Sequence, residues 1–139
     1  MAIKYFGRKK VHVYHDNFEY YQPNKHVCGD CAIRAITKAT GLTWKDAYIE
    51  ACNATANDMY TFNETQGMTI YLETKGFKWV PIKPERGECR PTVAEFAENH
   101  LNGKYILNIS NHFVACQNGK YYDIWDCGDK SLYGYWFKK

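Results

Sequence analysis

The sequence lacks most features that mark membrane, secreted and nucleic-acid-binding proteins. No apolar run approaches the roughly 20 residues that a membrane-spanning helix needs. The first residues, Met-Ala-Ile-Lys-Tyr-Phe-Gly, carry a charge where a secretory signal has its apolar segment, so we expect no such signal. The net charge is only +3, and the basic residues are interspersed with acidic ones, which predicts no nucleic-acid partner. Internal repeats, linkers and low-complexity tracts are also missing.

The six cysteines do not have the spacing of a compact disulfide framework. Without a secretory signal, we expect the chain in the cytoplasm (a host cytoplasm, if it is viral), where thiols stay reduced. The length of 139 residues predicts one domain with a sizeable core. Twelve tyrosines and four tryptophans suit a β-rich core or a groove.

The order of the predicted elements is helices first and an antiparallel sheet second, which is an α+β fold. The expected helices are Cys31 to Gly41, Trp44 to about Cys52, Gly67 to Lys75, and one that opens with the capping box Thr92-Val-Ala-Glu95 and buries Val93, Phe96, Ala97 and Leu101. The expected strands are Ile3–Phe6, Val11–Tyr14, Phe77–Ile82, Lys104–Ile109, His112–Gln117, Lys120–Asp126 and Leu132–Phe137. Pro81 predicts an edge position for its strand, and the apolar run Lys104–Ile109 predicts a central strand.

A β-hairpin near the C-terminus places several chemically useful side chains together. An Asn-Gly pair at residues 118–119 predicts a tight turn, because both positions of that turn need positive φ. The turn fixes the register, so His112, Asp123 and Trp125 lie on one face. Asp123 is then diagonal to His112, and Trp125 is directly across from it. A histidine held by a carboxylate and shielded by an indole is typical of the base half of a nucleophilic site.

The candidate nucleophile lies far upstream, at Cys31, where a polar loop enters the first predicted helix. The partial positive charge of a helix N-terminus favours a thiolate over a thiol. The N–H groups there also stabilise an oxyanion formed by attack on a carbonyl. We expect His112 to pair with Cys31 and Asp123 to fix the orientation of His112.

Two short motifs resemble papain-like cysteine peptidases. The run Cys-Gly-Asp-Cys at residues 28–31 is similar to that family's Cys-Gly-x-Cys, whose second cysteine is the nucleophile. The run Asp-Ile-Trp at residues 123–125 resembles the family's Asn-x-Trp, with aspartate in place of asparagine, and the order Cys, His, Asp is also that of the family. The spacing is more similar to compact branches such as bacteriocin-leader peptidases, and residues 30–35 resemble a run in OTU-type deubiquitinases. The resemblance, which covers Cys28 to Trp125, implies a papain-like fold with the cysteine at a helix start, packed on a C-terminal antiparallel sheet.

The resemblance implies a thiol hydrolase that cleaves peptide or isopeptide bonds in a peptide or protein substrate, with no cofactor and no metal. Cys31 would attack the carbonyl, and His112 would protonate the leaving amine. Asp123 would orient His112, and Trp125 would shield their contact from water. The change Asp123→Asn is expected to be tolerated, because asparagine fills that place in the family.

Two residues depart from the family pattern. The family has an oxyanion-hole glutamine six residues before the nucleophile, where this chain has Lys25. Gln22 and Asn24 are the nearest amides, and we expect one of them to hold the oxyanion together with the N–H of Cys31. Asp30 lies beside the nucleophile, where a carboxylate raises the thiol pKa by repulsion unless it points away.

Three other interpretations stay open. Cys28 and Cys31 form a C-x-x-C that suits redox chemistry or zinc, with His26 or Cys127 as further ligands, although no second C-x-x-C exists. The missing glutamine favours a non-catalytic binding module on the same fold, for instance a viral or mobile-element protein. A Cys-His-Asp site also serves acyltransferases that pass the acyl group to an amine. The remaining cysteines are expected to be structural: Cys52, Cys89, Cys116 and Cys127.

Overall fold

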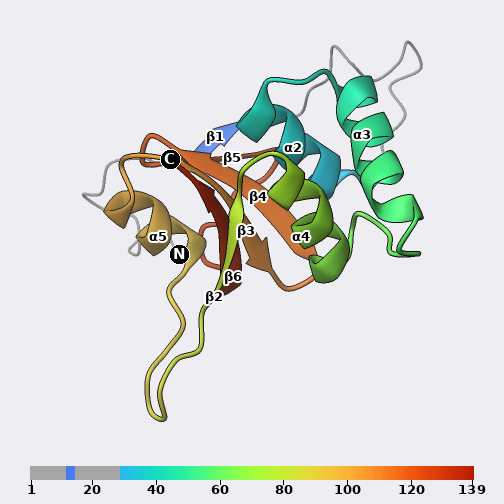
Figure 1. Cartoon of the computed structure of the whole chain (residues 1–139). Coiled ribbons are helices and arrows are strands. Elements are labelled where there is room, and N and C mark those ends of the chain that lie inside the picture. The colour runs from blue at the N-terminus through green and yellow to red at the C-terminus, as the bar shows by residue number, and fades with distance from the viewer. Residues whose placement is uncertain (1–11, 15–28) are drawn as a thin grey trace.

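The computed structural model describes residues 12–14 and 29–139, which form an α+β fold as the sequence predicts (Figure 1). The helices are α2 (Cys31–Thr40), α3 (Trp44–Ala56), α4 (Thr65–Thr74) and α5 (Val93–Asn99). The strands are β1 (His12–Tyr14), β2 (Lys78–Pro81), β3 (Lys104–Ile109), β4 (His112–Gln117), β5 (Lys120–Asp123) and β6 (Leu132–Lys138). The strand predicted at Ile3–Phe6 lies outside the described residues.

The strands form one sheet in the order β1-β5-β4-β3-β6-β2. Strand β3 lies between β4 and β6, which confirms the prediction of a central strand. Strand β2 pairs only with β6, so Pro81 sits on an edge strand as predicted, where its missing N–H costs no interior ladder bond. The pairs are antiparallel with one exception, because β1 runs parallel to β5. The predicted C-terminal antiparallel sheet is therefore present, and the N-terminal strand β1 extends it in parallel at one edge, which the sequence did not predict.

The hairpin between β4 and β5 has the predicted turn. Asn118 and Gly119 have φ values of 56° and 75°, and the adjacent Gln117 and Lys120 pair with each other. Strand β5 ends at Asp123, however, rather than at Asp126 as predicted. The side chain of Asp123 accepts the N–H of Ile124 at 2.8 Å, and such a local bond competes with the sheet ladder.

The sheet separates two layers of helices (Figure 1). Helices α2, α3 and α4 cover one face, and α5 covers the other. Because successive side chains of a strand point to opposite faces of the sheet, the same strands contribute buried residues to both cores. Buried strand residues on the first face include Ile106, Phe113, Ala115 and Trp136. Those on the α5 face include Leu107, Val114, Cys116 and Tyr121.

Two helices begin directly after a threonine whose side chain caps their first turn. Thr43 caps α3 by accepting the N–H of Asp46 at 3.1 Å. The predicted capping box of α5 is present, with reciprocal bonds between Thr92 and Glu95 of 2.8 and 3.2 Å. In the described part of the chain, no helix is both long and apolar enough to span a membrane.

Three helix limits differ from the predictions. Helix α3 continues past Cys52 to Ala56, and α4 begins before Gly67, at Thr65. Helix α5 ends at Asn99, so the helical repeat does not reach Leu101, and that side chain is 65% exposed instead of buried.

Candidate active site

Cys31 is the first residue of α2 and carries a free, partly buried thiol. Its sulfur is hydrogen-bonded to the ring of His112 and accepts the backbone N–H of Phe113. Burial raises the pKa of the Cys31 thiol, but these two bonds and the positive charges of His112 and Arg34 outweigh burial and leave the pKa below its usual value. The site therefore favours a thiolate.

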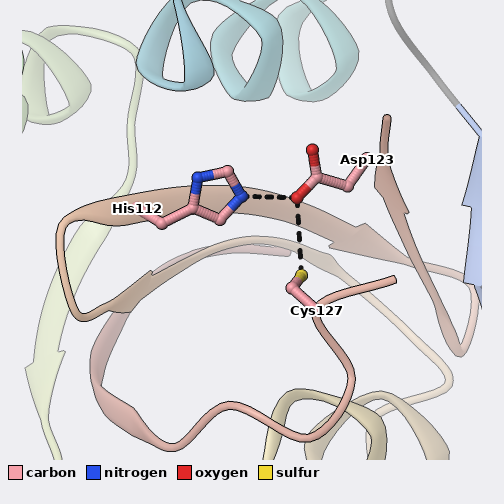
Figure 2. Close-up of side chains that lie close together, drawn as sticks. All are labelled: His112, Asp123 and Cys127. Carbon is pink, nitrogen blue, oxygen red and sulfur yellow. Dashed lines mark hydrogen bonds and ion pairs between the residues drawn. The ribbon is translucent and has the colours of Figure 1, made fainter. Parts of the chain in front are cut away.

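His112 is the first residue of β4 and lies between Cys31 and Asp123. Its Nε2 atom bonds Oδ2 of Asp123 at 2.5 Å (Figure 2). Nδ1 is therefore the ring nitrogen that remains for Cys31. Burial lowers the imidazole pKa, but the bonds to Asp123 and Cys31 and their charges raise it to about 9. The ring of Trp125 lies against the imidazole, with centroids 5.1 Å apart, while 42% of Trp125 stays exposed.

Asp123 ends β5 and is only 2% exposed. Its Oδ1 atom accepts from Nη2 of Arg34 at 3.2 Å and from the N–H of Ile124 at 2.8 Å. Its Oδ2 atom accepts from His112 and, at 3.4 Å, from Sγ of Cys127 (Figure 2). Burial raises the carboxyl pKa, but the bond and charge of His112, the Ile124 N–H and the charge of Arg34 hold it below its usual value. Asp123 is thus an ionised carboxylate, and each of its two oxygens accepts hydrogen bonds.

Arg34 had no role in the sequence-based site. It is 6% exposed on α2 and forms ion pairs with Asp30 and with Asp123. The other oxygen of Asp30 accepts the indole N–H of Trp44 at 2.8 Å, and its side chain makes no capping bond to the helix. The negative charge beside the candidate nucleophile is therefore balanced by a guanidinium. The i,i+4 spacing of Asp30 and Arg34 around Cys31 was the available signal.

Cys127 was expected to be only structural, and it contacts the site instead. Its thiol is buried and donates to Asp123. Burial and the charge of Asp123 raise the pKa of Cys127 far above its usual range, so it stays a thiol. No local pattern links it to the hairpin, because it lies in the segment beyond β5. Cys116 is buried in the core, and burial raises its pKa to about 12, which agrees with a structural role.

Three side chains here have the types that bind metal ions. The ligand atoms of His112, Asp123 and Cys127 lie within 4.8 Å of one another. A cation at this place would meet the guanidinium of Arg34 beside Asp123, and it would have to displace the proton of Cys127. The cluster therefore suits a hydrogen-bonded site better than a metal site. The zinc and redox alternative depends on Cys28, which with His26 lies outside the described residues.

Two hollows flank His112. The first, of about 440 Å³, borders both Cys31 and His112. It is lined mainly by polar residues: Asn63, Glu64, Thr65, Asn108 and Asn111. The second, of about 400 Å³, borders His112 but not Cys31, and two half-exposed aromatic residues, Trp125 and Tyr133, form part of its wall. His112 thus stands between two spaces that are each large enough for part of a substrate.

The structure brings together Cys31, His112, Asp123 and Trp125, whereas Gln22 and Asn24 lie outside the described residues. The backbone N–H of Cys31 remains as an oxyanion donor at the helix start. Comparisons with protein-family models, with curated proteins and with solved structures found no match for the chain.

Proposed function

We propose that the chain is a compact papain-like thiol hydrolase that cleaves peptide or isopeptide bonds. One observation carries this proposal: Cys31, His112 and Asp123 form a continuous hydrogen-bonded line that begins at a helix N-terminus. A lowered thiol pKa next to a raised imidazole pKa is typical of a thiolate–imidazolium pair. A free thiol stays reduced in the cytoplasm, which is the compartment that we propose.

In the first half-reaction, the thiolate of Cys31 attacks the carbonyl carbon, and a C–S bond forms. The charge that develops on the carbonyl oxygen is stabilised by the N–H of Cys31 and the partial charge of the α2 N-terminus. His112 then gives its proton to the leaving nitrogen as the C–N bond breaks. The products of this step are a free amine and a thioester on Cys31.

In the second half-reaction, His112 acts as a base. It takes a proton from water while the water oxygen attacks the thioester. The C–S bond breaks, a carboxylic acid leaves, and the thiolate and the imidazolium are restored. Asp123 holds the ring orientation throughout, and Trp125 shields the His112–Asp123 contact from water.

The two hollows suggest how a substrate lies across the site. The acyl part becomes attached to Cys31, so it belongs in the polar hollow that borders Cys31. The leaving amine receives a proton from His112, so its side belongs in the hollow beyond His112, beside Trp125 and Tyr133. An extended polypeptide segment that crosses His112 satisfies both requirements.

Thiol labelling tests the proposal directly. We would treat the native protein with limiting iodoacetamide at pH 6, where a thiol with a pKa of about 8.5 is almost wholly protonated. Cys31 should be modified first, and the modification, mapped by mass spectrometry, should disappear in His112→Ala. Cys89, which is exposed and lies outside the site, is the internal reference. Equally slow labelling of Cys31 and Cys89 would contradict the proposal and favour a non-catalytic binding module.

Turnover then tests the nucleophile. Quenched-fluorescence peptide libraries and isopeptide-linked substrates should be cleaved by the wild-type protein and not by Cys31→Ala, with circular dichroism unchanged. The matched control is Cys52→Ala, which removes a partly buried thiol on α3 and should leave turnover intact. Full activity in Cys31→Ala would show that another residue performs the chemistry.

A further inference from the structure

We infer that Arg34 is a positioning residue that ties the helix of the nucleophile to the carboxylate behind the base and requires that carboxylate to be an aspartate. This inference rests on the proposed function, since it concerns how the same site is held together. It also reverses an expectation from the sequence, namely that asparagine is tolerated at position 123.

The position of Arg34 within the fold is the first argument. Its guanidinium uses Nη1 to pair with Asp30, the residue before the nucleophile, and Nη2 to pair with Asp123, the residue behind the base. The side chains of Arg34 and Asp123 are 7% and 2% exposed, so solvent screens their ion pair little. Because one rigid, planar group contacts both carboxylates, it fixes the distance between the start of α2 and the end of β5.

The surroundings of Asp123 are the second argument. The four described polar contacts of its carboxylate come from donors: Arg34 and Ile124 on Oδ1, and His112 and Cys127 on Oδ2. An ionised carboxylate accepts all four, but an asparagine has only one acceptor oxygen. Its NH₂ group would face either Arg34 and Ile124 or His112 and Cys127. Donors would then face donors in a buried place, which costs the full desolvation of the groups left unsatisfied.

The charge balance of the site is the third argument. Asp30 and Asp123 bring two negative charges close to a cysteine that must become a thiolate. Arg34 lies between the two carboxylates and also lowers the pKa of Cys31 through its charge. Without Arg34, both carboxylates would oppose ionisation of the thiol. A purely structural ion pair would instead change stability and leave the reactivity of Cys31 unchanged.

The experiment measures the rate of Cys31 alkylation by iodoacetamide between pH 5 and 9, which requires no substrate. In Arg34→Gln we expect the whole profile to move to higher pH, because loss of the guanidinium charge raises the thiol pKa of Cys31. Arg34→Lys keeps the positive charge but loses the planar guanidinium that contacts both carboxylates. Its alkylation rate should therefore lie between those of Arg34→Gln and the wild type. The matched control is Lys38→Gln, which removes a positive charge one turn further along α2, where Lys38 contacts the ring of Tyr122. It should leave the profile unchanged.

A double-mutant cycle shows whether Arg34 acts through Asp123. Asp123→Asn should slow alkylation at pH 6 at least as much as Arg34→Gln does. In the Asp123→Asn background, Arg34→Gln should slow alkylation by a smaller factor than in the wild type, because only the direct charge of Arg34 and its pairing with Asp30 are then lost, and fully multiplied effects would overturn the inference. If Arg34→Gln does not fold, the comparison of Arg34→Lys with Lys38→Gln replaces it.

The two proposals fail in different ways. A wild-type Cys31 that is slow at pH 6 would remove the proposed function, whatever Arg34 does. A fast wild-type Cys31, with an unchanged pH profile in Arg34→Lys and Arg34→Gln, would leave the function standing and show that Arg34 is only structural. A pH profile that moves as far in Lys38→Gln as in Arg34→Gln would also overturn the inference. Any positive charge on α2 would then lower the thiol pKa as much as Arg34 does.

Discussion

His112 determines, at the scale of single residues, how far into the alkaline range the site should work. Its pKa of about 9 lies above the usual 6.5, so the fold stabilises the protonated ring, and this stabilisation is lost as the pH rises through about 9. The leaving amine needs that proton. We expect hydrolysis to fall above about pH 9, whereas alkylation of Cys31 should stay fast, because the thiolate persists there.

Parallel pH profiles of turnover and of alkylation test this expectation. In Asp123→Ala the imidazole loses its main charge partner, so the alkaline limit of any remaining turnover should move toward neutral pH. A wild-type alkaline limit near pH 6.5 would mean that His112 is not held by Asp123 in solution.

Local patterns predicted the residues of the site that depend on neighbours in sequence. Cys31 was identified by its place at a helix start, and His112 and Asp123 by hairpin register. Arg34 and Cys127 were missed as parts of the site for a physical reason. Arg34 acquires its role by contact with Asp123, 89 residues away, and neither a helical repeat nor a strand repeat encodes such a contact.

At the scale of elements, starts were easier to predict than ends. The capping box predicted the start of α5, because its side chains bond the first N–H groups of the helix. The end of β5 was missed because the Asp123 side chain takes the N–H of Ile124. The early start of α4 was missed because Glu64 occupies the N-cap without a side-chain bond to the helix, so no capping pattern marks it.

The segment before α4 leads to an element-scale prediction. A methyl group on Gly67 would lie 1.9 Å from the carbonyl oxygen of Thr61, so the segment from Thr61 to Glu64, which borders the polar hollow, would have to move. We expect Gly67→Ala to lower the free energy of unfolding by about 1–3 kcal/mol, as overpacking does. Urea titration of Gly67→Ala against Gln66→Ala, an exposed neighbour on the same helix, measures this. Equal stability of the two variants would contradict the close approach.

At the scale of the whole molecule, Trp136 joins the sheet to the helical layer of α2, α3 and α4. It is fully buried on β6, donates its indole N–H to Thr69 of α4 at 3.0 Å, and packs against Trp79 with centroids 4.6 Å apart. We expect Trp136→Ala to cost about 3–5 kcal/mol by cavity formation. Chemical denaturation checks this value, with Tyr133→Ala, a 46% exposed aromatic on the same strand, as the control. A loss no larger than that of the control would contradict this role.

The layout of the molecule was predictable only in part. Helical and alternating repeats predicted which segments are helices and which are strands, and therefore the α+β class. They did not predict that β1 would pair in parallel with β5, where the ring of His12 bonds the backbone carbonyl of Asp123 at 3.0 Å. Strand neighbours are chosen by contacts between distant segments, which repeats within one segment do not record.

The place of β6 in the sheet has a consequence for a newly made chain. β6 comes last among the strands in sequence, yet it lies between β3 and β2, so neither of them has its full set of partners until residues 132–138 have left the ribosome. Cys31 is made long before that moment, while His112 and Asp123 emerge late. A hydrolase built in this order would stay inert while these residues are being made and gain its reactive sulfur only after His112, Asp123 and β6 have all emerged.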